Sequence, residues 1–262
     1  IIGERGFIGK YLYKYLKKFF YLKKISFKDL KKFKNKLNNF DFIINSSINK
    51  NYILKKYNER FDNDYRISKL IDNQKTIYCF ISTRKVYPSK ANLKERSKLS
   101  PKSHYSKNKL ITEKKISKKL RTNLLVLRVS NIIGDTKTSK RIHRTFIDIF
   151  HRNIQKGIVL DNGKIFKDFL SIDKFCQILK EIINKKLIGT YNVSIGQKVY
   201  LNDLISWLIK FNNKKLKIKK DVNLNKESFY LNNRKLMSKI KIKNSIKELK
   251  VFCHKYRKRK FS

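Results

Sequence analysis

A tyrosine and a lysine four residues apart have the spacing that proton transfer requires. Tyr105 and Lys109 lie in a segment whose helical pattern continues through Leu110, Ile111 and Ile116. Side chains at positions i and i+4 share one helix face. A free phenol titrates near ~10 and is a poor acid or base at neutral pH, whereas an ammonium one turn away favours the phenolate. The pair could therefore act as a general acid and base.

The same spacing also arises by chance in a chain this rich in lysine. Of the 262 residues, 66 are Lys or Arg, so a tyrosine followed four residues later by a lysine is expected several times. The pair alone favours an ordinary solvated helix face. A catalytic role requires elements that place it beside a cofactor and a third polar group.

Three glycines near the start of the chain predict a dinucleotide-binding loop. Gly3, Gly6 and Gly9 follow two apolar residues and precede a helical pattern with Leu12 and Leu16. In such a loop one glycine allows the tight turn, one lets the pyrophosphate approach the backbone, and one lets the helix pack on the strand. The helix N-terminus then faces the anion. Because the chain begins without Met and almost without a first strand, we expect residues to be missing at its N-terminus.

Apolar strand segments alternate with helical segments in the first half of the chain. The strand segments are 40–45, 76–81 and 124–129, and the helical ones are 29–37, 58–73 and the segment from Tyr105. This alternation predicts an α/β fold with a doubly wound, Rossmann-like parallel sheet. Ligands of such sheets bind at the carboxyl ends of the strands. Gly3, Ser46, Thr83 and Asn131 all fall there.

The second half of the sequence is mixed and predicts a small C-terminal lobe. Its expected elements are a helix over 143–154, a hairpin over 159–165 around Asp161-Asn162-Gly163, a helix capped by Asp173, a strand over 189–193 and a helix over 201–209. We divide the chain into a dinucleotide-binding domain over 1–135, with a truncated first strand, and a remainder over 136–262. The remainder is mainly a substrate-binding lobe, with some segments returning to the first domain.

The composition is that of a globular protein. Hydrophobic residues make up 40% of the chain, which excludes a disordered protein. No apolar run reaches the ~18 residues of a membrane span, and no signal peptide is visible. Cys79, Cys176 and Cys253 have no paired spacing. They predict neither disulfides nor a metal site, and they fit a reducing cytoplasm.

The formal net charge of +47 raises the question of an anionic partner. A basic patch is typical of proteins that bind nucleic acid or anionic membranes. Here the lysines extend over the whole length, together with abundant Asn and Ile, which favours a uniform drift in residue usage. The densest cluster, 254–260, leaves a weak polyanion contact as the alternative.

These segments together resemble the extended short-chain dehydrogenase/reductase family, the NAD-dependent epimerase/dehydratase proteins that modify nucleotide sugars. The resemblance covers nearly the whole chain and consists of seven motifs in the family's order. They are Gly3-x-x-Gly6-Phe7-Ile8-Gly9; the helix of Asn63 with Leu70-Ile71; Phe80–Tyr87, similar to "ISS-x-x-VYG"; Tyr105-x-x-x-Lys109; Leu127–Gly134, similar to "LR-x-x-N-x-x-G"; Lys167–Asp173, similar to "RDFI-x-VDD"; and Gly189–Val193, similar to "G-x-YN".

The resemblance implies a role for each candidate residue. Tyr105 would be the general acid/base at the sugar, and Lys109 would hold the nicotinamide ribose and favour the phenolate. Thr83 would hydrogen-bond the reacting oxygen, and Asn131 would contact the phosphate of the nucleotide sugar. The ordinary alternatives are a plain strand end for Thr83 and a turn former for Asn131. The implied cofactor-binding residues are Gly3, Arg5, Gly6, Phe7, Ile8, Gly9, Ser46, Asn63 and Lys109.

Departures from the family pattern narrow the expected chemistry. Family dehydratases carry an Asp-Glu pair directly after the catalytic Ser/Thr, and Arg84-Lys85 stand there instead, so dehydration is not expected. The acidic residue about 20 positions after the glycine loop, which would bind an adenosine ribose, has no clear counterpart. Arg5 precedes the second glycine, as in relatives that prefer NADP. We therefore expect NAD(P) as the cofactor, with NADP(H) slightly favoured.

Two functional classes remain at this stage. One is an NAD(P)-dependent epimerase or ketoreductase of a nucleotide-sugar substrate, and we expect it as a homodimer. The other is a non-catalytic protein of the same fold that binds RNA or another polyanion through its basic surface. The retention of Thr83, Tyr105 and Lys109 favours the enzyme, because a binding module does not need all three.

Overall fold

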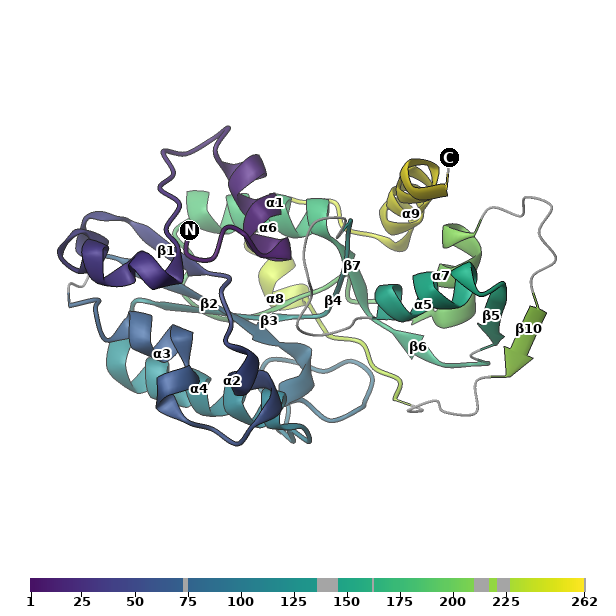
Figure 1. Cartoon of the computed structure of the whole chain (residues 1–262), viewed down its shortest axis with the longest axis horizontal. Coiled ribbons are helices and arrows are strands. Elements are labelled where there is room, and N and C mark those ends of the chain that lie inside the picture. Colours follow the sequence, from purple (N-terminus) through teal and green to yellow (C-terminus); the bar gives the residue numbers. More distant parts are fainter. Residues whose placement is uncertain (73–74, 136–145, 162, 210–216, 221–226, 262) are drawn as a thin grey trace.

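A parallel four-stranded sheet forms the centre of the computed structural model, which describes residues 1–72, 75–135, 146–161, 163–209, 217–220 and 227–261 (Figure 1). Its strands, in spatial order, are β1 (Phe42–Asn45), β2 (Ile77–Thr83), β3 (Leu124–Val129) and β8 (Gly189–Val193). Beyond β1, Ile2 forms parallel bridges with Asn45 on one side and with Ile25 on the other. The glycine loop thus follows a short strand-like contact, and the predicted doubly wound sheet is confirmed.

Two layers of helices cover the two faces of the sheet. One layer contains α1 (Phe7–Leu16) and α6 (Ile172–Asn184), and the other contains α2 (Lys50–Leu54), α3 (Asn63–Ser68) and α4 (His104–Leu120). Neighbouring strand residues alternate between two cores, with Cys79 packed on the side of α1 and Tyr78 on the side of α4. Both faces of the sheet are buried, which is why its strands are continuous apolar runs in the sequence.

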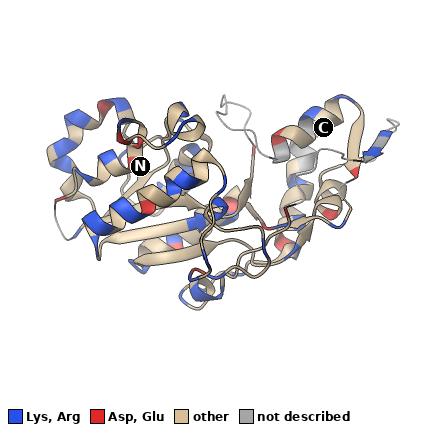
Figure 2. Ribbon diagram, turned by 90° about the horizontal axis from the view of Figure 1, so that it is seen from below, with Lys and Arg blue, Asp and Glu red and all other residues tan. Residues whose placement is uncertain are grey.

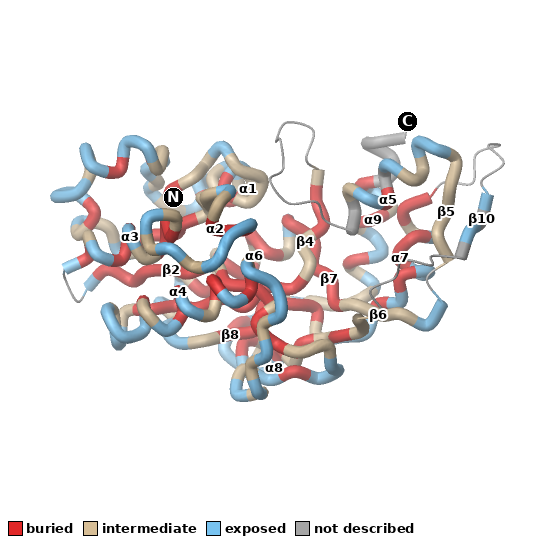
Figure 3. The backbone as a smooth tube through the Cα atoms, turned by 60° about the horizontal axis from the view of Figure 1, so that its bottom comes forward, coloured by how far each residue is buried: buried red, intermediate tan, exposed pale blue. Residues whose placement is uncertain are grey.

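The C-terminal part adds short strand pairs beyond the sheet. β4 (Asn131–Ile133) is parallel to β7 (Phe169–Ser171), β6 (Phe166–Lys167) is antiparallel to β9 (Val199–Tyr200), and β5 (Ile158–Asp161) is parallel to β10 (Lys217–Lys220). Its helices include α5 (Phe146–Gln155), α7 (Leu201–Leu208), α8 (Arg234–Met237) and α9 (Ile246–Phe261). Figure 3 shows buried residues following the sheet strands and continuing through β7 into this part.

Some local predictions differ from the structure. The hairpin expected over 159–165 is wrong, because β5 pairs with β10 and the next strand, β6, pairs with β9; Asn162 of its turn lies outside the described residues. Ser171, and not Asp173, caps α6, because its side chain accepts a hydrogen bond from the N–H of Lys174. The helix expected over 58–73 is divided into the 3-10 helix η2 (Glu59–Phe61) and α3, and the segment from Phe27 to Asn39 is also a 3-10 helix, η1.

The positive charge is spread over the whole described molecule. Figure 2 shows Lys and Arg on helices and connecting segments throughout, with fewer Asp and Glu among them. Within the described ranges, no helix is long and apolar enough to cross a membrane, and no cluster of His, Cys, Asp and Glu could hold a metal ion. The distribution agrees with the uniform drift that the sequence favours.

A buried polar network joins the carboxyl ends of the sheet strands to α4. Arg128 of β3 donates from Nη2 to Glu113 Oε2 at 2.7 Å and from Nη1 to the Tyr87 hydroxyl at 2.8 Å. That hydroxyl in turn donates to Asn192 Oδ1 of β8 at 2.9 Å, and the Ser82 hydroxyl of β2 donates to Glu113. A buried polar network stabilises one arrangement of its elements only when each donor and acceptor in it has a hydrogen-bond partner. It therefore fixes β2, β3 and β8 relative to the helix that carries Tyr105.

A second buried anchor is the carboxylate of Asp168, between β6 and β7. It accepts backbone N–H groups from Ile195 at 3.0 Å and from Gly196 and Leu231, both at 3.1 Å. These donors belong to the loop after β8 and to the segment before α8. One side chain therefore connects three distant segments of the C-terminal part.

We expect Asp168 to make the protein less stable as the pH rises. Burial raises the pKa of its carboxyl group to about 7, and the hydrogen bonds from Leu231, Gly196 and Ile195 offset this only in part. Below about pH 4 the group is protonated in both states. Between about pH 4 and about pH 7 the unfolded chain loses the proton first, so the free energy of unfolding falls by on the order of a few kcal/mol.

Urea unfolding of the wild type and of Asp168→Asn across this pH range measures the effect. The variant should be less stable than the wild type at low pH, because an amide nitrogen cannot accept the backbone N–H groups, and the difference should shrink as the pH rises. It should also lack the part of the pH dependence that Asp168 contributes. Parallel curves for the two proteins would contradict the assignment.

Candidate active site

The glycine loop has the close contacts that a dinucleotide cradle requires. Gly3 has a φ of +84°, and a Cβ on it would lie 2.5 Å from the backbone nitrogen of Ser47. A Cβ on Gly9 would lie 2.4 Å from both the Gly3 carbonyl oxygen and the Ser46 hydroxyl. Gly6 is the N-cap residue of α1, whose first turn has no acidic residue. These glycines therefore bring the N-terminus of α1 against β1, and the residues present fit a bound pyrophosphate.

Ser46 and Asn63, both predicted cofactor contacts, hold the backbone around this loop. The Ser46 hydroxyl lies 3.0 Å from the Ile2 carbonyl oxygen and 2.9 Å from that of Gly3. Asn63 Nδ2 donates to the Ser47 hydroxyl at 3.0 Å. Ser46 therefore holds the backbone of the glycine loop, and Asn63 holds Ser47 after β1.

The remaining predicted contacts are distributed around the loop. The Arg5 side chain is 89% exposed, with its Nε 3.7 Å from Glu4 Oε1. Phe7 and Ile8 are partly buried and pack against the core, and a Cβ on Gly134 would come within 2.7 Å of the Phe7 ring. The ring of Phe7 therefore connects α1 to the loop after β4.

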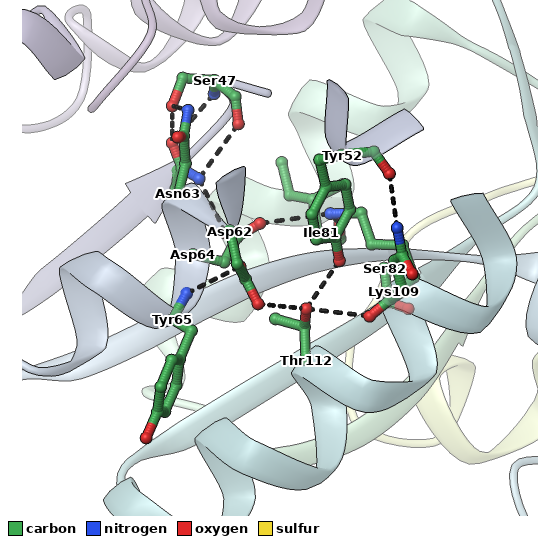
Figure 4. A network of polar contacts seen from close by, with 12 residues as sticks. Ser47, Tyr52, Asp62, Asn63, Asp64, Tyr65, Ile81, Ser82, Lys109 and Thr112 are labelled. Carbon is green, nitrogen blue, oxygen red and sulfur yellow. Dashed lines mark hydrogen bonds and ion pairs between the residues drawn. The ribbon is translucent and has the colours of Figure 1, made fainter. Parts of the chain in front are cut away.

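Lys109 lies at the centre of a buried polar cluster (Figure 4). Its Nζ is 3.3 Å from Asp64 Oδ2 of α3 and donates to the Ile81 carbonyl oxygen of β2 at 2.9 Å. The other oxygen of Asp64 accepts from Asn45 Nδ2 and from the Tyr78 hydroxyl, both at 2.8 Å. The Lys109 and Asp64 side chains are 7% and 6% exposed. The ammonium is therefore fixed between α3, α4 and β2.

The surroundings of Lys109 keep it charged. Burial lowers the pKa of Lys109, but Asp64, Tyr105 and Asp62 raise it by more, so the net shift of the pKa is upward. Tyr105 also contributes to the raised pKa of Tyr52, for which burial is the main cause. Tyr105 is thus close enough to Lys109 and Tyr52 to affect the pKa of both groups.

Thr83 and Asn131 complete the set of predicted site residues. Thr83 is the last residue of β2, and its hydroxyl accepts the Lys85 N–H at 3.2 Å to cap the 3-10 helix η3 (Arg84–Val86). α4 packs against both β2 and η3. Asn131 Nδ2 donates to the Asp168 carbonyl oxygen at 3.3 Å, where β4 meets β7. The structure therefore places Thr83 and the Lys109 ammonium near the end of β2, Tyr105 one turn before Lys109 on α4, and Asn131 on the strand pair of β4 and β7.

The sequence analysis missed the acidic partners of α4. Asp64 directly follows Asn63, and Glu113 follows Lys109 by one further helical turn, but neither was singled out. The chain has 66 basic residues and only 19 acidic ones. An acidic residue within an apolar helical pattern could therefore have indicated a buried ion pair. Buried carboxylates in such a chain are expected to pair with buried cations.

A parallel sheet with a glycine loop at its edge and a tyrosine–lysine helix at its strand ends defines a class of dinucleotide-dependent α/β enzymes. A family model described as the NAD dependent epimerase/dehydratase family matches residues 38–194. The match covers more than half of the chain, so this protein belongs to that family. The resemblance read from the seven motifs is confirmed, as is the NAD(P) class of cofactor.

Several solved structures share the fold. The chain is similar to UDP-N-acetylglucosamine 4-epimerase from Methanobrevibacter ruminantium, with 17% identity, a TM-score of 0.76, and 98% of this chain and 96% of that chain covered. It is similar to a dTDP-4-dehydrorhamnose reductase from Clostridium acetobutylicum, with 15% identity, a TM-score of 0.75 and coverage of 100% and 98%. It is also similar to dTDP-glucose 4,6-dehydratase from Bacillus anthracis, with 16% identity, a TM-score of 0.74 and coverage of 99% and 96%. No curated protein matches the sequence.

We expect Asp64→Asn to be strongly destabilising. The substitution leaves the buried Lys109 ammonium without a countercharge, which typically costs about 3–5 kcal/mol of unfolding free energy. Glu59→Gln is the matched control. Glu59 pairs at 2.8 Å with Lys115, which lies on α4 as Lys109 does, but the side chains of Glu59 and Lys115 are both more than a third exposed. Its loss should be much smaller, since solvent screens that pair. Urea unfolding of both variants at neutral pH makes the comparison, and equal losses would contradict the role given to Asp64.

Proposed function

We propose that this protein is an NAD(P)-dependent epimerase or ketoreductase that acts on a carbon of a nucleotide-linked sugar. The observation that carries the proposal is the Lys109 ammonium, buried beside Tyr105 at the end of β2 and held there by Asp64 and the Ile81 carbonyl. Family membership supports the cofactor class and the broad substrate class.

The proposed mechanism gives each side chain one task. When bound, NAD(P) supplies the site that accepts or donates a hydride. Tyr105 removes the proton of the sugar hydroxyl as the C–H bond breaks, and returns a proton to that oxygen when the hydride comes back. Lys109 stabilises the Tyr105 phenolate electrostatically, and Thr83 donates a hydrogen bond to the reacting oxygen.

Dehydration is excluded from the proposal because of the residues that follow Thr83. Water elimination needs a carboxyl group there to move protons at the neighbouring carbon, and Arg84 and Lys85 cannot take that part. Arg84 Nη2 is instead paired with Glu227 Oε2 at 3.2 Å. The structural neighbours include an epimerase, a reductase and a dehydratase. Of these three reactions, Arg84 and Lys85 favour epimerisation and reduction.

We expect Tyr105→Phe to lower kcat by ~10²–10⁴-fold, because the ring without its hydroxyl cannot move the proton. Binding of NADH or NADPH should be retained. Mass spectrometry of a panel of nucleotide sugars incubated with the wild type and the variant, each with NAD⁺ and NADPH, measures turnover. Tyr21→Phe is the control, since Tyr21 is 89% exposed. Equal turnover by wild type and Tyr105→Phe would remove the catalytic assignment, and nucleic-acid binding by a protein without turnover would favour the polyanion-binding alternative.

We propose that NADP(H) is slightly favoured, because Arg5 is exposed and stands beside the second glycine, where its guanidinium would pair with a 2′-phosphate. Arg5→Gln should weaken NADPH binding about two- to five-fold, as expected for an exposed ion pair, and leave NADH binding unchanged. Fluorescence titration with each dinucleotide measures both affinities, with Lys14→Gln on the exposed face of α1 as the control. A parallel loss for NADH would contradict the contact with the 2′-phosphate.

A further inference from the structure

The segment between α1 and η1 is basic and aromatic on its exposed side. It reads Lys17-Lys18-Phe19-Phe20-Tyr21-Leu22-Lys23-Lys24, so two pairs of lysines flank four aromatic or aliphatic residues. Figure 1 shows it at the edge of the molecule, in purple, where the chain leaves α1. We call residues 17–24 the basic-aromatic segment.

The four central side chains of this segment alternate between the core and the solvent. Phe20 and Leu22 are partly buried and pack against the core. Tyr21 is 89% exposed and Phe19 is 48% exposed, with the Phe19 ring 5.3 Å from that of Tyr15. The two inward side chains therefore anchor the segment, and the two outward rings are available to a partner.

The lysines of the segment are brought together with the neighbouring elements. Lys17 Nζ lies 6.0 Å and Lys24 Nζ 5.3 Å from the centre of the same ring, that of Tyr13 on α1. Lys23 Nζ lies 5.8 Å from the centre of the Phe33 ring of η1. All four lysines of the segment are exposed. The end of α1, the basic-aromatic segment and η1 therefore form one continuous basic surface.

This part of the chain has an unusual excess of positive charge. From Lys10 to Asn39 the sequence has 11 lysines and a single acidic residue, Asp29, whereas the whole chain has 66 basic and 19 acidic residues. None of the four lysines of the segment forms an ion pair with a carboxylate of the described residues. The local excess is larger than the uniform drift of the chain gives, and it is not compensated within the described structure.

The basic surface lies away from the proposed active site. α1 begins at the glycine loop, and its ten residues span about 15 Å. The basic-aromatic segment follows the far end of α1, whereas ligands of such a sheet bind at the carboxyl ends of its strands. A partner on this surface would leave the glycine loop and Tyr105 accessible, so the inference does not depend on the proposed function.

The composition of the surface favours lipid over nucleic acid as the partner. From residue 10 to residue 39 all the cations are lysines, and arginine, whose planar fork suits the recognition of nucleic-acid phosphates, is absent. Lysines near an anionic leaflet are attracted as point charges and need no fixed geometry. A tyrosine has an apolar ring and a polar tip, which suits it to the boundary between lipid and water.

We propose that the basic-aromatic segment binds an anionic membrane surface. Lys17 and Lys24 lie against the lipid headgroups, and the Tyr21 ring inserts among them. The lysines supply the attraction to the surface, and the aromatic ring supplies the anchor. The protein is thereby held at the membrane with its glycine loop open to the solution.

Cosedimentation of the full chain with lipid vesicles measures this binding. The protein should bind vesicles with about a third phosphatidylserine, should not bind vesicles of phosphatidylcholine alone, and should be released by about 0.5 M NaCl. Lys17→Gln/Lys24→Gln should weaken binding about 20- to 30-fold, because each lysine contributes about fivefold. Tyr21→Ala should weaken it about fivefold, whereas Tyr21→Phe should retain it, since the ring remains.

The matched control is Lys114→Gln/Lys118→Gln, which removes the same charge from exposed positions of α4 on the other face of the sheet. It should change vesicle binding by less than about twofold. Equal losses in the two double variants, with unchanged thermal unfolding, would show that the charge acts diffusely and would overturn the proposal. Unweakened binding by Tyr21→Ala, or no binding to the anionic vesicles, would also overturn it.

A labelled single-stranded oligonucleotide distinguishes the other class of anionic partner. Under the proposal, Lys17→Gln/Lys24→Gln weakens vesicle binding whether or not the protein has any affinity for the oligonucleotide. Oligonucleotide binding that is lost in this variant, in a protein that does not bind the anionic vesicles, would assign the surface to nucleic acid and overturn the lipid assignment.

Discussion

The charged Lys109 can be buried only because Asp64 lies against it. Removing an ammonium from water costs several kcal/mol unless a carboxylate and further hydrogen bonds compensate. Asp64 supplies the charge, the Ile81 carbonyl supplies a hydrogen bond, and Asn45 and Tyr78 satisfy the second oxygen of Asp64. The positions of α3, α4, β1 and β2 therefore depend on one another through this pair, and Tyr105 receives its place from the same helix.

A second buried pair, Arg128–Glu113, has the same effect one helical turn further along α4. It connects β3 to the helix, and the Tyr87 hydroxyl extends the connection to β8. Tyr87, Arg128 and Asn192 belong to the motifs that carry the family resemblance, yet their observed contacts are with one another. These three motif residues thus hold the strand ends together.

The departures from the family pattern lie after Thr83 and in the region that follows the glycine loop. The dinucleotide loop keeps its glycines, and the Cβ contacts at Gly3 and Gly9 give a steric reason. By contrast, Arg84 and Lys85 replace carboxylates next to Thr83, and Arg84 gains partners in Glu227 and Phe229. Backbone packing therefore explains the glycines, and the contacts with Glu227 and Phe229 explain the position of Arg84.

The sequence by itself determined the parallel sheet, the glycine loop and the helix that brings Tyr105 and Lys109 onto one face. These features follow from local periodicity and from spacings of a few residues, which a single chain displays directly. Only the tertiary structure decided that Asp64, 45 positions away, is the partner of Lys109, and that Glu227, 143 positions away, is the partner of Arg84. It also decided that β5 pairs with β10. Such contacts depend on how whole elements pack, and a charged side chain in a chain with 66 basic residues carries no local sign of the partner it will meet.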